Sequence, residues 1–238
     1  MTVTSAAAQT RTPGVSEGDQ FTYGDITVEW STDHPNQTIY PSLEAMNQTE
    51  SLTLSVKDVS DTNITCELTQ HFRDGTEETQ QGYIDVDTGD SENITSLPLP
   101  FISKDLAEDD DIYDSEAFAG GKINETVTRT YPDETRETNH LNFTREQSME
   151  DQFQFMASNY YWDKPTGTLM EVSEESIYEA GGYTTSYTVQ VKITQSNKWS
   201  IPEFPTVLLL PLLMIATLLT TIAIRRKLKA TPERKRQK

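Results

Sequence analysis

The sequence predicts an all-β ectodomain, built as a twisted antiparallel sheet in the form of a half-barrel or a sandwich, followed by one C-terminal transmembrane α-helix. Three observations predict this class. Short segments in which apolar and polar residues alternate recur between residues 15 and 196, and turn-forming residues separate them. The same region shows no helical periodicity. An uncharged apolar run of 18 residues then follows at 207–224.

The first half of the ectodomain predicts one long strand and a meander. Gly18–Trp30 alternates, with a break near Gly24, and is expected to form a strand. Residues 31–50 are rich in proline and polar side chains, which indicates a loop. Three strands in a meander are expected between residues 51 and 87, because Asp74-Gly75 between two alternating segments is a strong hairpin signal.

The second half predicts more strands after one irregular segment. Residues 99–119 are the least strand-like part, where Phe101–Leu106 is compatible with a short helix and 108–114 is an acidic loop. Alternating segments then resume, and short runs of Pro, Asp and Gly separate them. The predicted strands are Ile123–Tyr131, Glu137–Phe143, Phe153–Trp162, Thr168–Val172 and Tyr183–Ile193.

The apolar run at 207–224 predicts a single membrane crossing. A helix of this length is about 27 Å long, close to the ~30 Å hydrocarbon core of a bilayer. The tail 225–238 holds eight Lys or Arg against one acid, and it starts with the stop-transfer residues Arg225, Arg226 and Lys227. The positive-inside rule therefore places the tail in the cytoplasm and the ectodomain outside. The alternatives are a buried core helix and a tail-anchored protein whose bulk is cytoplasmic.

The expected organisation of the chain has five parts. Residues 1–14 form a polar stub in which Ala6-Ala7-Ala8 resembles the end of a secretory signal, with cleavage before Gln9. The antiparallel β ectodomain follows at 15–196. A juxtamembrane linker at 197–206 contains the motif Pro202, Glu203, Phe204, Pro205. The transmembrane helix at 207–224 and the basic tail at 225–238 complete the chain.

Charge and cysteine content narrow the class of protein. The net charge is −19, and the tail contributes +7, which leaves −26 on the rest of the chain. Such an acidic surface disfavours nucleic acid and anionic lipid, and it suits a solvated domain beside a membrane. Cys66 is the only cysteine, so the chain has no internal disulfide. Its alternation with Ile64 and Leu68 predicts a buried thiol, with intermolecular pairing as the alternative.

Asparagine usage supports an exported ectodomain. Six of the nine asparagines lie in Asn-x-Thr sequons, which are N-glycosylation acceptors in exported proteins. In its predicted strand Asn63 alternates with Ile64, which places it on the solvent face. The alternative is that a Thr-rich strand protein forms sequons by chance. The predicted glycosylation sites are Asn36, Asn47, Asn63, Asn93, Asn124 and Asn142.

Motifs for catalysis or metal binding do not stand out. The three histidines, at positions 34, 71 and 140, are far apart, and the sequence lacks HExxH, Gly-x-Ser-x-Gly and phosphate-binding glycine loops. We therefore expect no enzymatic activity, no cofactor and no metal. Acidic clusters at 85–90 and 108–116 offer oxygen ligands for calcium, but neither fits an EF-hand, and both are also typical of solvated surface.

Aromatic residues gather in the last predicted strands. They either line a groove for glycan or lipid on the concave face of a curved sheet or form the core of that sheet. The scarcity of aliphatic residues favours the core. The residues are Phe153, Phe155, Tyr160, Tyr161, Trp162, Tyr178, Tyr183 and Tyr187.

The C-terminus resembles the signals of a family of archaeal surface proteins. Ile201-Pro-Glu-Phe-Pro205, an apolar helix and a basic tail are similar to PEF-type C-terminal anchor signals. Stretches of the ectodomain resemble recurring pieces of uncharacterised archaeal ectodomains with this C-terminus; they are Gly18–Tyr23, Arg129–Tyr131, Asn139–Asn142 and Tyr161–Gly167. The resemblance implies an archaeal cell-surface location and an archaeosortase as partner, with cleavage and permanent retention both open. It implies no activity.

These observations lead to one leading hypothesis and one main alternative, beside a tethered enzyme, for which the sequence shows no convergent polar cluster. The first is a single-pass, N-glycosylated surface protein with a structural, adhesive or interaction role, whose partners are the bilayer and envelope proteins or glycans. The alternative is a tethered binding module that holds an apolar or glycan ligand on the concave face of a curved sheet. A cavity lined by the strands Phe153–Trp162 and Tyr183–Ile193 favours the second, and a filled core contradicts it.

Overall fold

The protein is represented by a computed structural model, which describes residues 11–115, 121–132, 134–149 and 151–199. These residues contain one antiparallel sheet of ten strands, which confirms the all-β prediction. The strands are β1 (Gln20–Thr32), β2 (Thr49–Ser60), β3 (Asn63–Phe72), β4 (Glu77–Asp85), β5 (Ser91–Glu92), β6 (Glu125–Tyr131), β7 (Glu134–Met149), β8 (Gln152–Asp163), β9 (Leu169–Ala180) and β10 (Tyr183–Ser196).

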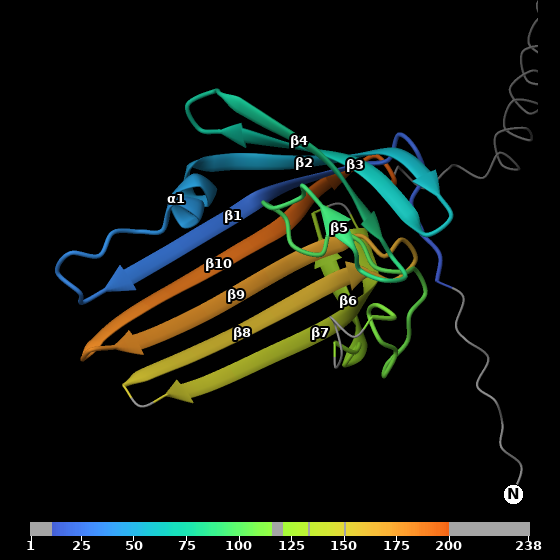
Figure 1. The fold of residues 1–238 in the computed structure, drawn as a ribbon. Coiled ribbons are helices and arrows are strands. Elements are labelled where there is room, and N and C mark those ends of the chain that lie inside the picture. The colour runs from blue at the N-terminus through green and yellow to red at the C-terminus, as the bar shows by residue number, and fades with distance from the viewer. Residues whose placement is uncertain (1–10, 116–120, 133, 150, 200–238) are drawn as a thin grey trace, which may run out of the picture. The chain divides into compact units, whose positions relative to one another are not determined.

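The sheet consists of two meanders joined at its centre. The strand order is β5-β4-β3-β2-β1-β10-β9-β8-β7-β6, so the first and last strands are neighbours. β1 pairs with β10 over almost its full length, from Phe21 opposite Ser196 to Thr32 opposite Thr185. Figure 1 shows the strand direction turning progressively between β7 and β4, which is the twist expected of a large open sheet.

Side chains alternate between two faces of this sheet. We call the face that carries Phe21, Leu54 and Trp162 the core face, and the face that carries Tyr161 and Glu171 the outer face. Large core-face side chains from both meanders are completely buried. They include Phe21, Tyr23, Leu52, Leu54, Ile64, Leu68, Ile84 and Trp162.

Irregular chain between β5 and β6, rather than a second sheet, covers the core face. Leu97, Phe101, Leu106 and Tyr113 from this covering segment (residues 93–115 and 121–124) are buried. The Trp162 Nε1–H donates to the Leu99 carbonyl at 2.9 Å, and the Tyr113 hydroxyl donates to the Phe101 carbonyl at 2.7 Å. The described residues therefore form one sheet with a covering segment and not the two packed sheets of a sandwich.

The short helix considered for Phe101–Leu106 is wrong. Leu99 and Asp105 have φ values of 47° and 57°, and residues with this left-handed backbone do not continue an α-helix. Instead Phe101 forms a β-bridge with Thr168, and the Pro100 carbonyl accepts a hydrogen bond from the Leu169 N–H at 2.9 Å. Pairing with the start of β9 therefore determines the conformation of this segment.

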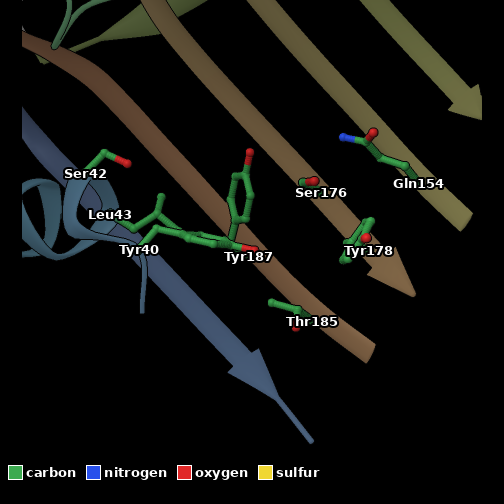
Figure 2. A pocket seen from close by; sticks show the side chains of 8 residues that line it. All are labelled: Tyr40, Ser42, Leu43, Gln154, Ser176, Tyr178, Thr185 and Tyr187. Atoms are coloured by element: carbon green, nitrogen blue, oxygen red, sulfur yellow. The ribbon is translucent and has the colours of Figure 1, made fainter. Parts of the chain in front are cut away.

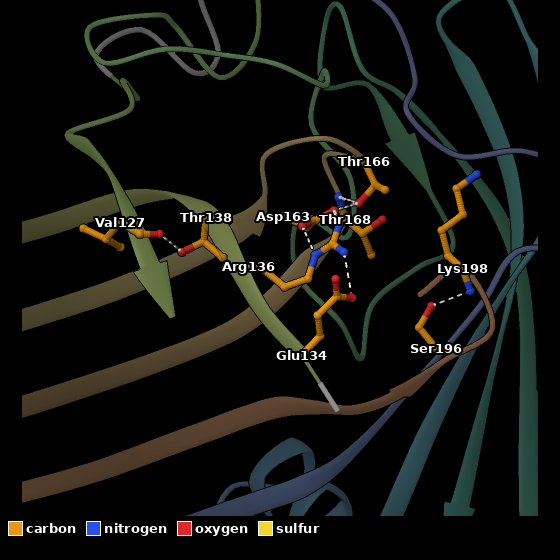
Figure 3. Close-up of polar contacts among 9 residues, drawn as sticks. All are labelled: Val127, Glu134, Arg136, Thr138, Asp163, Thr166, Thr168, Ser196 and Lys198. Atoms are coloured by element: carbon orange, nitrogen blue, oxygen red, sulfur yellow. Dashed lines mark hydrogen bonds and ion pairs between the residues drawn. The ribbon is translucent and has the colours of Figure 1, made fainter. Parts of the chain in front are cut away.

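A buried ion pair fixes the turn between β8 and β9 (Figure 3). Arg136 donates to both carboxylate oxygens of Asp163, at 2.6 and 2.9 Å, and the Thr166 hydroxyl donates to Asp163 at 2.6 Å. The next residue, Gly167, has φ +68°, and a Cβ there would lie 2.0 Å from the Ile102 carbonyl oxygen. Only glycine therefore allows the turn to approach the covering segment so closely.

Residues 31–50 contain a helix where only a loop was predicted. Helix α1 (Pro41–Gln48) has proline in its first turn, and the Thr49 hydroxyl donates to the Ala45 carbonyl at 2.8 Å near its C-terminal end. Leu43 is its only buried residue, so a helix of eight residues with a single buried position leaves no periodic pattern in the sequence.

The covering segment protects only one half of the long strands. We call the ends of β1 and of β7 to β10 that it covers, together with β2 to β4, the covered half. The other ends form the open half, in which five strands lie side by side. The open half consists of 26–32 of β1, 183–189 of β10, 173–180 of β9, 152–158 of β8 and 142–149 of β7.

Candidate functional site

The open half exposes apolar side chains on the core face. Five large apolar or aromatic side chains of the described residues are exposed, and all of them belong to the open half or to the residue just before α1. Strand register places the four strand residues among them on the core face. The exposed residues are Tyr40, Phe143, Met149, Tyr178 and Tyr183.

A groove of about 350 Å³ lies on this face between α1 and strands β8 to β10. Figure 2 shows Leu43 and Tyr40 reaching toward Tyr187 from the α1 side, while Ser176 and Gln154 continue the floor across β9 and β8. We call it the tyrosine groove, and its lining residues are Tyr40, Ser42, Leu43, Gln154, Ser176, Tyr178, Thr185 and Tyr187.

The wall of the groove is held to the sheet by the loop before α1. Gln37 donates to the Tyr40 hydroxyl at 3.0 Å and accepts from the Thr185 hydroxyl at 3.0 Å. The Thr184 N–H donates to the Asp33 carboxylate at 2.7 Å. Leu43, which is buried, packs the helix on the sheet. The loop therefore connects the wall to the floor strand β10 through polar contacts at both of its ends.

Tyr187 of the groove is hydrogen-bonded to a residue of the neighbouring strand β9. Its hydroxyl donates to the Glu174 carboxylate at 2.5 Å, and both residues lie on the core face. Burial first, and then this hydrogen bond, raise the pKa of Tyr187 to about 12. The phenol therefore stays neutral at physiological pH, and an acidic side chain lies beside the floor of the groove.

A second cluster, on the outer face, is a closed network of side chains. Arg129 donates to both carboxylate oxygens of Glu171, at 3.1 and 2.9 Å, and its guanidinium lies 4.0 Å from the centre of the Tyr161 ring. His140 stacks on Tyr161 with ring centres 4.4 Å apart, and contacts Glu125 at 3.1 Å. Three stretches that carried the family resemblance, around Arg129, His140 and Tyr161, therefore meet on one face, where their charges compensate each other.

The two acidic clusters considered for calcium have other roles. One Asp85 oxygen accepts from the backbone N–H groups of Asp87 and Thr88, and the other accepts from the Thr62 hydroxyl. In the second cluster Asp110 accepts from the Ala107 N–H at 2.7 Å. Within the described ranges, no group of three or more His, Cys, Asp or Glu is placed to hold a metal ion.

Five of the six sequon asparagines are exposed and Asn63, beside the β2–β3 turn, is half-buried. Asn124 and Asn142 are neighbours, because the Asn142 N–H donates to the Asn124 side-chain oxygen at 2.5 Å. The Asn142 amide nitrogen donates to Asn159 at 2.8 Å. N-glycosylation leaves one N–H on this nitrogen, so the hydrogen bond is compatible with a glycan.

The predicted anchor lies outside the described residues. This applies to the motif at 202–205, the apolar run at 207–224 and the stop-transfer residues 225–227, as well as to residues 1–10 of the N-terminal stub. In the part of the chain that the structure describes, no helix is both long enough and apolar enough to cross a membrane.

The aromatic residues singled out in the sequence divide between three environments. Trp162 is fully buried in the core and Tyr160 stacks on it, with ring centres 5.3 Å apart. Tyr178 and Tyr187 line the groove, whereas Tyr161 belongs to the outer-face network. The preferred interpretation as core is therefore correct for Trp162 and its stacking partner Tyr160, whereas Tyr183 is exposed and Phe153 and Phe155 lie half-buried on the outer face. The sequence analysis missed the contribution of α1, and Pro41 followed by Leu43 is the one signal that pointed to it.

A scan against protein-family models matched no family, and a search of the curated proteins found no match.

Proposed function

We propose that this chain is a membrane-anchored, N-glycosylated surface protein whose β ectodomain binds a ligand in the tyrosine groove. The single observation that carries the binding role is that the exposed large apolar side chains gather on one face of the open half. Exposed apolar side chains that cluster on one face mark interaction sites, whereas scattered ones are ordinary surface. The groove lies on that face. Its floor includes residues of β8 and β10, the two strands that the sequence analysis named as the lining of a binding module.

Features of the sequence support the surface location. The apolar run at 207–224 with its basic tail fits a single crossing with the C-terminus inside. The sequon side chains are at the surface or half-exposed, where oligosaccharyl transfer reaches them. The PEF-type signal makes an archaeal envelope and anchoring through an archaeosortase part of this proposal.

The position of the groove suits a tethered binding module. Thr185 and Tyr187 of the groove lie near the start of β10, which begins at Tyr183 and ends at Ser196. At a rise of about 3.3 Å per residue, roughly 30 Å of strand separates the groove from the point where the chain leaves the sheet. The groove and the point where a tether would begin therefore lie toward opposite ends of β10.

The binding role is tested with the full chain purified from its host membranes in mild detergent. Ser42 is exposed in the lining, so Ser42→Trp fills the groove without entering the core. We expect native mass spectrometry to show a retained small ligand on the wild type and its loss from this variant. Ser60→Trp is the matched control, because Ser60 is an exposed residue at the end of β2. Retention of the same ligand by Ser42→Trp contradicts the proposed site.

Location is tested on the same preparation by glycopeptide mapping. Sugars on the six sequon asparagines are the expected result. A protein whose sequons are all unmodified, isolated from a host that glycosylates other surface proteins, contradicts the extracytoplasmic location and favours the tail-anchored alternative.

A further inference from the structure

The chemistry of the tyrosine groove indicates what it binds. Its eight lining residues comprise three tyrosines, three hydroxyl residues, one amide and one leucine, and none of them carries a charge at neutral pH. The volume of about 350 Å³ is at the lower end of small-molecule sites. The groove thus combines flat aromatic rings with hydroxyl and amide groups, and lacks a charged anchor.

Several polar groups of the lining are free to bind a ligand. Among the described residues, the side chains of Ser42, Gln154 and Tyr178 make no hydrogen bond to protein, although their neighbours Tyr40, Thr185 and Tyr187 do. An aliphatic chain in the groove would desolvate these groups without replacing their bonds to water, which is unfavourable. A ligand with hydroxyl groups on its edges and C–H groups on its faces satisfies both kinds of lining.

The electrostatics of the site disfavour an acidic ligand. The Glu174 carboxylate accepts the Tyr187 hydroxyl bond at 2.5 Å beside the floor, and the lining contains no Lys, Arg or His. The chain without its tail carries a charge of −26, which adds a general repulsion. The lining itself therefore offers an anion no cation to pair with. The nearest cation that strand register places on this face is Arg145 of β7, which donates to Gln147 opposite Gln154.

We propose that the tyrosine groove binds an uncharged saccharide, with a sugar ring stacked on Tyr178 and its hydroxyl groups bonded to Gln154 and Ser42. This inference rests on the proposed function, because it assigns a ligand class to the same groove. Two sources supply such a saccharide: a neutral polysaccharide of the envelope, or the N-glycans of a second copy of this chain. Tyr40 of the lining lies only four residues from the predicted glycan on Asn36.

The test uses the full chain in detergent against three sets of immobilised or labelled probes. These are neutral oligosaccharides, uronic-acid oligosaccharides of equal length, and a fluorescent fatty acid. We expect binding to the neutral set, and we expect Tyr178→Ala to weaken it by about tenfold or more, as loss of an aromatic anchor in a binding site does. Tyr178→Phe keeps the ring and should retain most of the affinity. Tyr83→Ala, a half-buried tyrosine of β4, is the control.

The outcomes distinguish the saccharide inference from the proposal that the groove binds a ligand at all. Binding of neutral sugars that Tyr178→Ala weakens supports the saccharide inference. Preference for the acidic set, or neutral binding that Tyr178→Ala leaves unchanged, overturns it. If no sugar binds, but the wild type binds the fatty acid and Ser42→Trp does not, the saccharide inference is overturned while the groove remains a binding site. The absence of binding to all three sets, together with an empty groove in native mass spectrometry, overturns both.

The two sources are separated by the glycans of the protein itself. If the ligand is the N-glycan of a second copy, the glycosylated chain self-associates, and enzymatic deglycosylation or added free oligosaccharide abolishes the association. If the ligand is an envelope polysaccharide, deglycosylation leaves both the oligomeric state and the binding of neutral sugars unchanged.

Discussion

The covered and open halves of the sheet contain opposite ends of the same long strands, but their core-face side chains differ in exposure. Trp162, near the end of β8 in the covered half, is fully buried, whereas Tyr178 of β9 and Met149 of β7 in the open half are 36% and 59% exposed. All three lie on the core face. The difference arises because the covering segment contacts only one end of the strands. Alternation alone therefore tells which face a residue occupies, but not whether that face is buried.

Polar contacts explain why the covering segment stays in place over one half. The buried Asn139 amide donates to the Leu106 carbonyl at 2.9 Å, and the Tyr113 hydroxyl donates to the Phe101 carbonyl. An irregular segment cannot pair its own backbone groups, so side chains of the sheet and of the segment must satisfy them. In the open half α1 contributes one buried leucine, which leaves the groove beside it uncovered.

The largest expected effect separates the two halves by truncating one aromatic residue in each. Trp162→Ala should lower the free energy of unfolding by about 3–5 kcal/mol, because it opens a cavity and leaves the Leu99 carbonyl unpaired. Tyr178→Ala should change it by less than about 1 kcal/mol, as is usual for an exposed residue. Urea unfolding of the full chain in detergent, followed by far-UV circular dichroism, measures both. Equal losses in the two variants would show that the open half is as much a part of the core as the covered half.

The next effect is a loss of stability at alkaline pH to which the buried groups of the covered half contribute most and Tyr187 of the open half also contributes. Burial raises the pKa of the Cys66 thiol to about 12, and burial raises the pKa values of the Tyr23 and Tyr113 hydroxyls far above their usual range. These groups remain protonated in the folded state but ionise in the unfolded state, at about pH 8.5 for Cys and about pH 10 for Tyr. Stability is therefore complete below those values and falls as the pH rises above them, by up to ~1.4 kcal/mol per pH unit for each group.

Two variants assign that loss to particular groups. Cys66→Ala should remove the part that begins near pH 9, and Tyr113→Phe should make the decline above about pH 10 shallower. Tyr113→Phe also loses the hydrogen bond to Phe101, at a cost of about 1 kcal/mol at neutral pH. Free energies of unfolding between pH 7 and 11 provide the measurement. A decline with unchanged slope in both variants would show that the ionisation of Cys66 and Tyr113 does not cause it.

Much of the sheet was predictable because it rests on local signals. The β2–β4 meander and the turn at Asp74 follow from alternation and turn chemistry, and the turn forms with Gly75 at φ +86° and Thr76 bonded to Asp74. β9 was predicted to end at Val172, but it continues to Ala180. Its second half carries polar side chains on both faces, as an uncovered sheet allows, so alternation disappears while the strand persists.

The groove was only half predictable, since its parts are distant in sequence. The strands that form its floor were named as one possible lining of a binding site, because their aromatic residues cluster in sequence. Its wall depends on α1, whose position on the sheet is set by contacts such as that between Gln37 and Thr185, 148 residues apart. The covering segment was also missed, because its buried residues are irregularly spaced and its conformation is set by pairing with β9.

The smallest expected effect tests whether the exposed apolar residues of the open half serve recognition or stability. Phe143 and Met149 lie on the core face of β7 and are 41% and 59% exposed, so Phe143→Ser and Met149→Ser should change the free energy of unfolding by no more than about 0.5 kcal/mol. Phe143 is the middle residue of the Asn142 sequon, and its replacement by serine leaves the sequon intact. Urea unfolding of both variants beside the wild type, followed by far-UV circular dichroism, measures the change. If either variant instead loses 2 kcal/mol or more, as a buried apolar residue would, then β7 is packed against something in solution and the open half is not open.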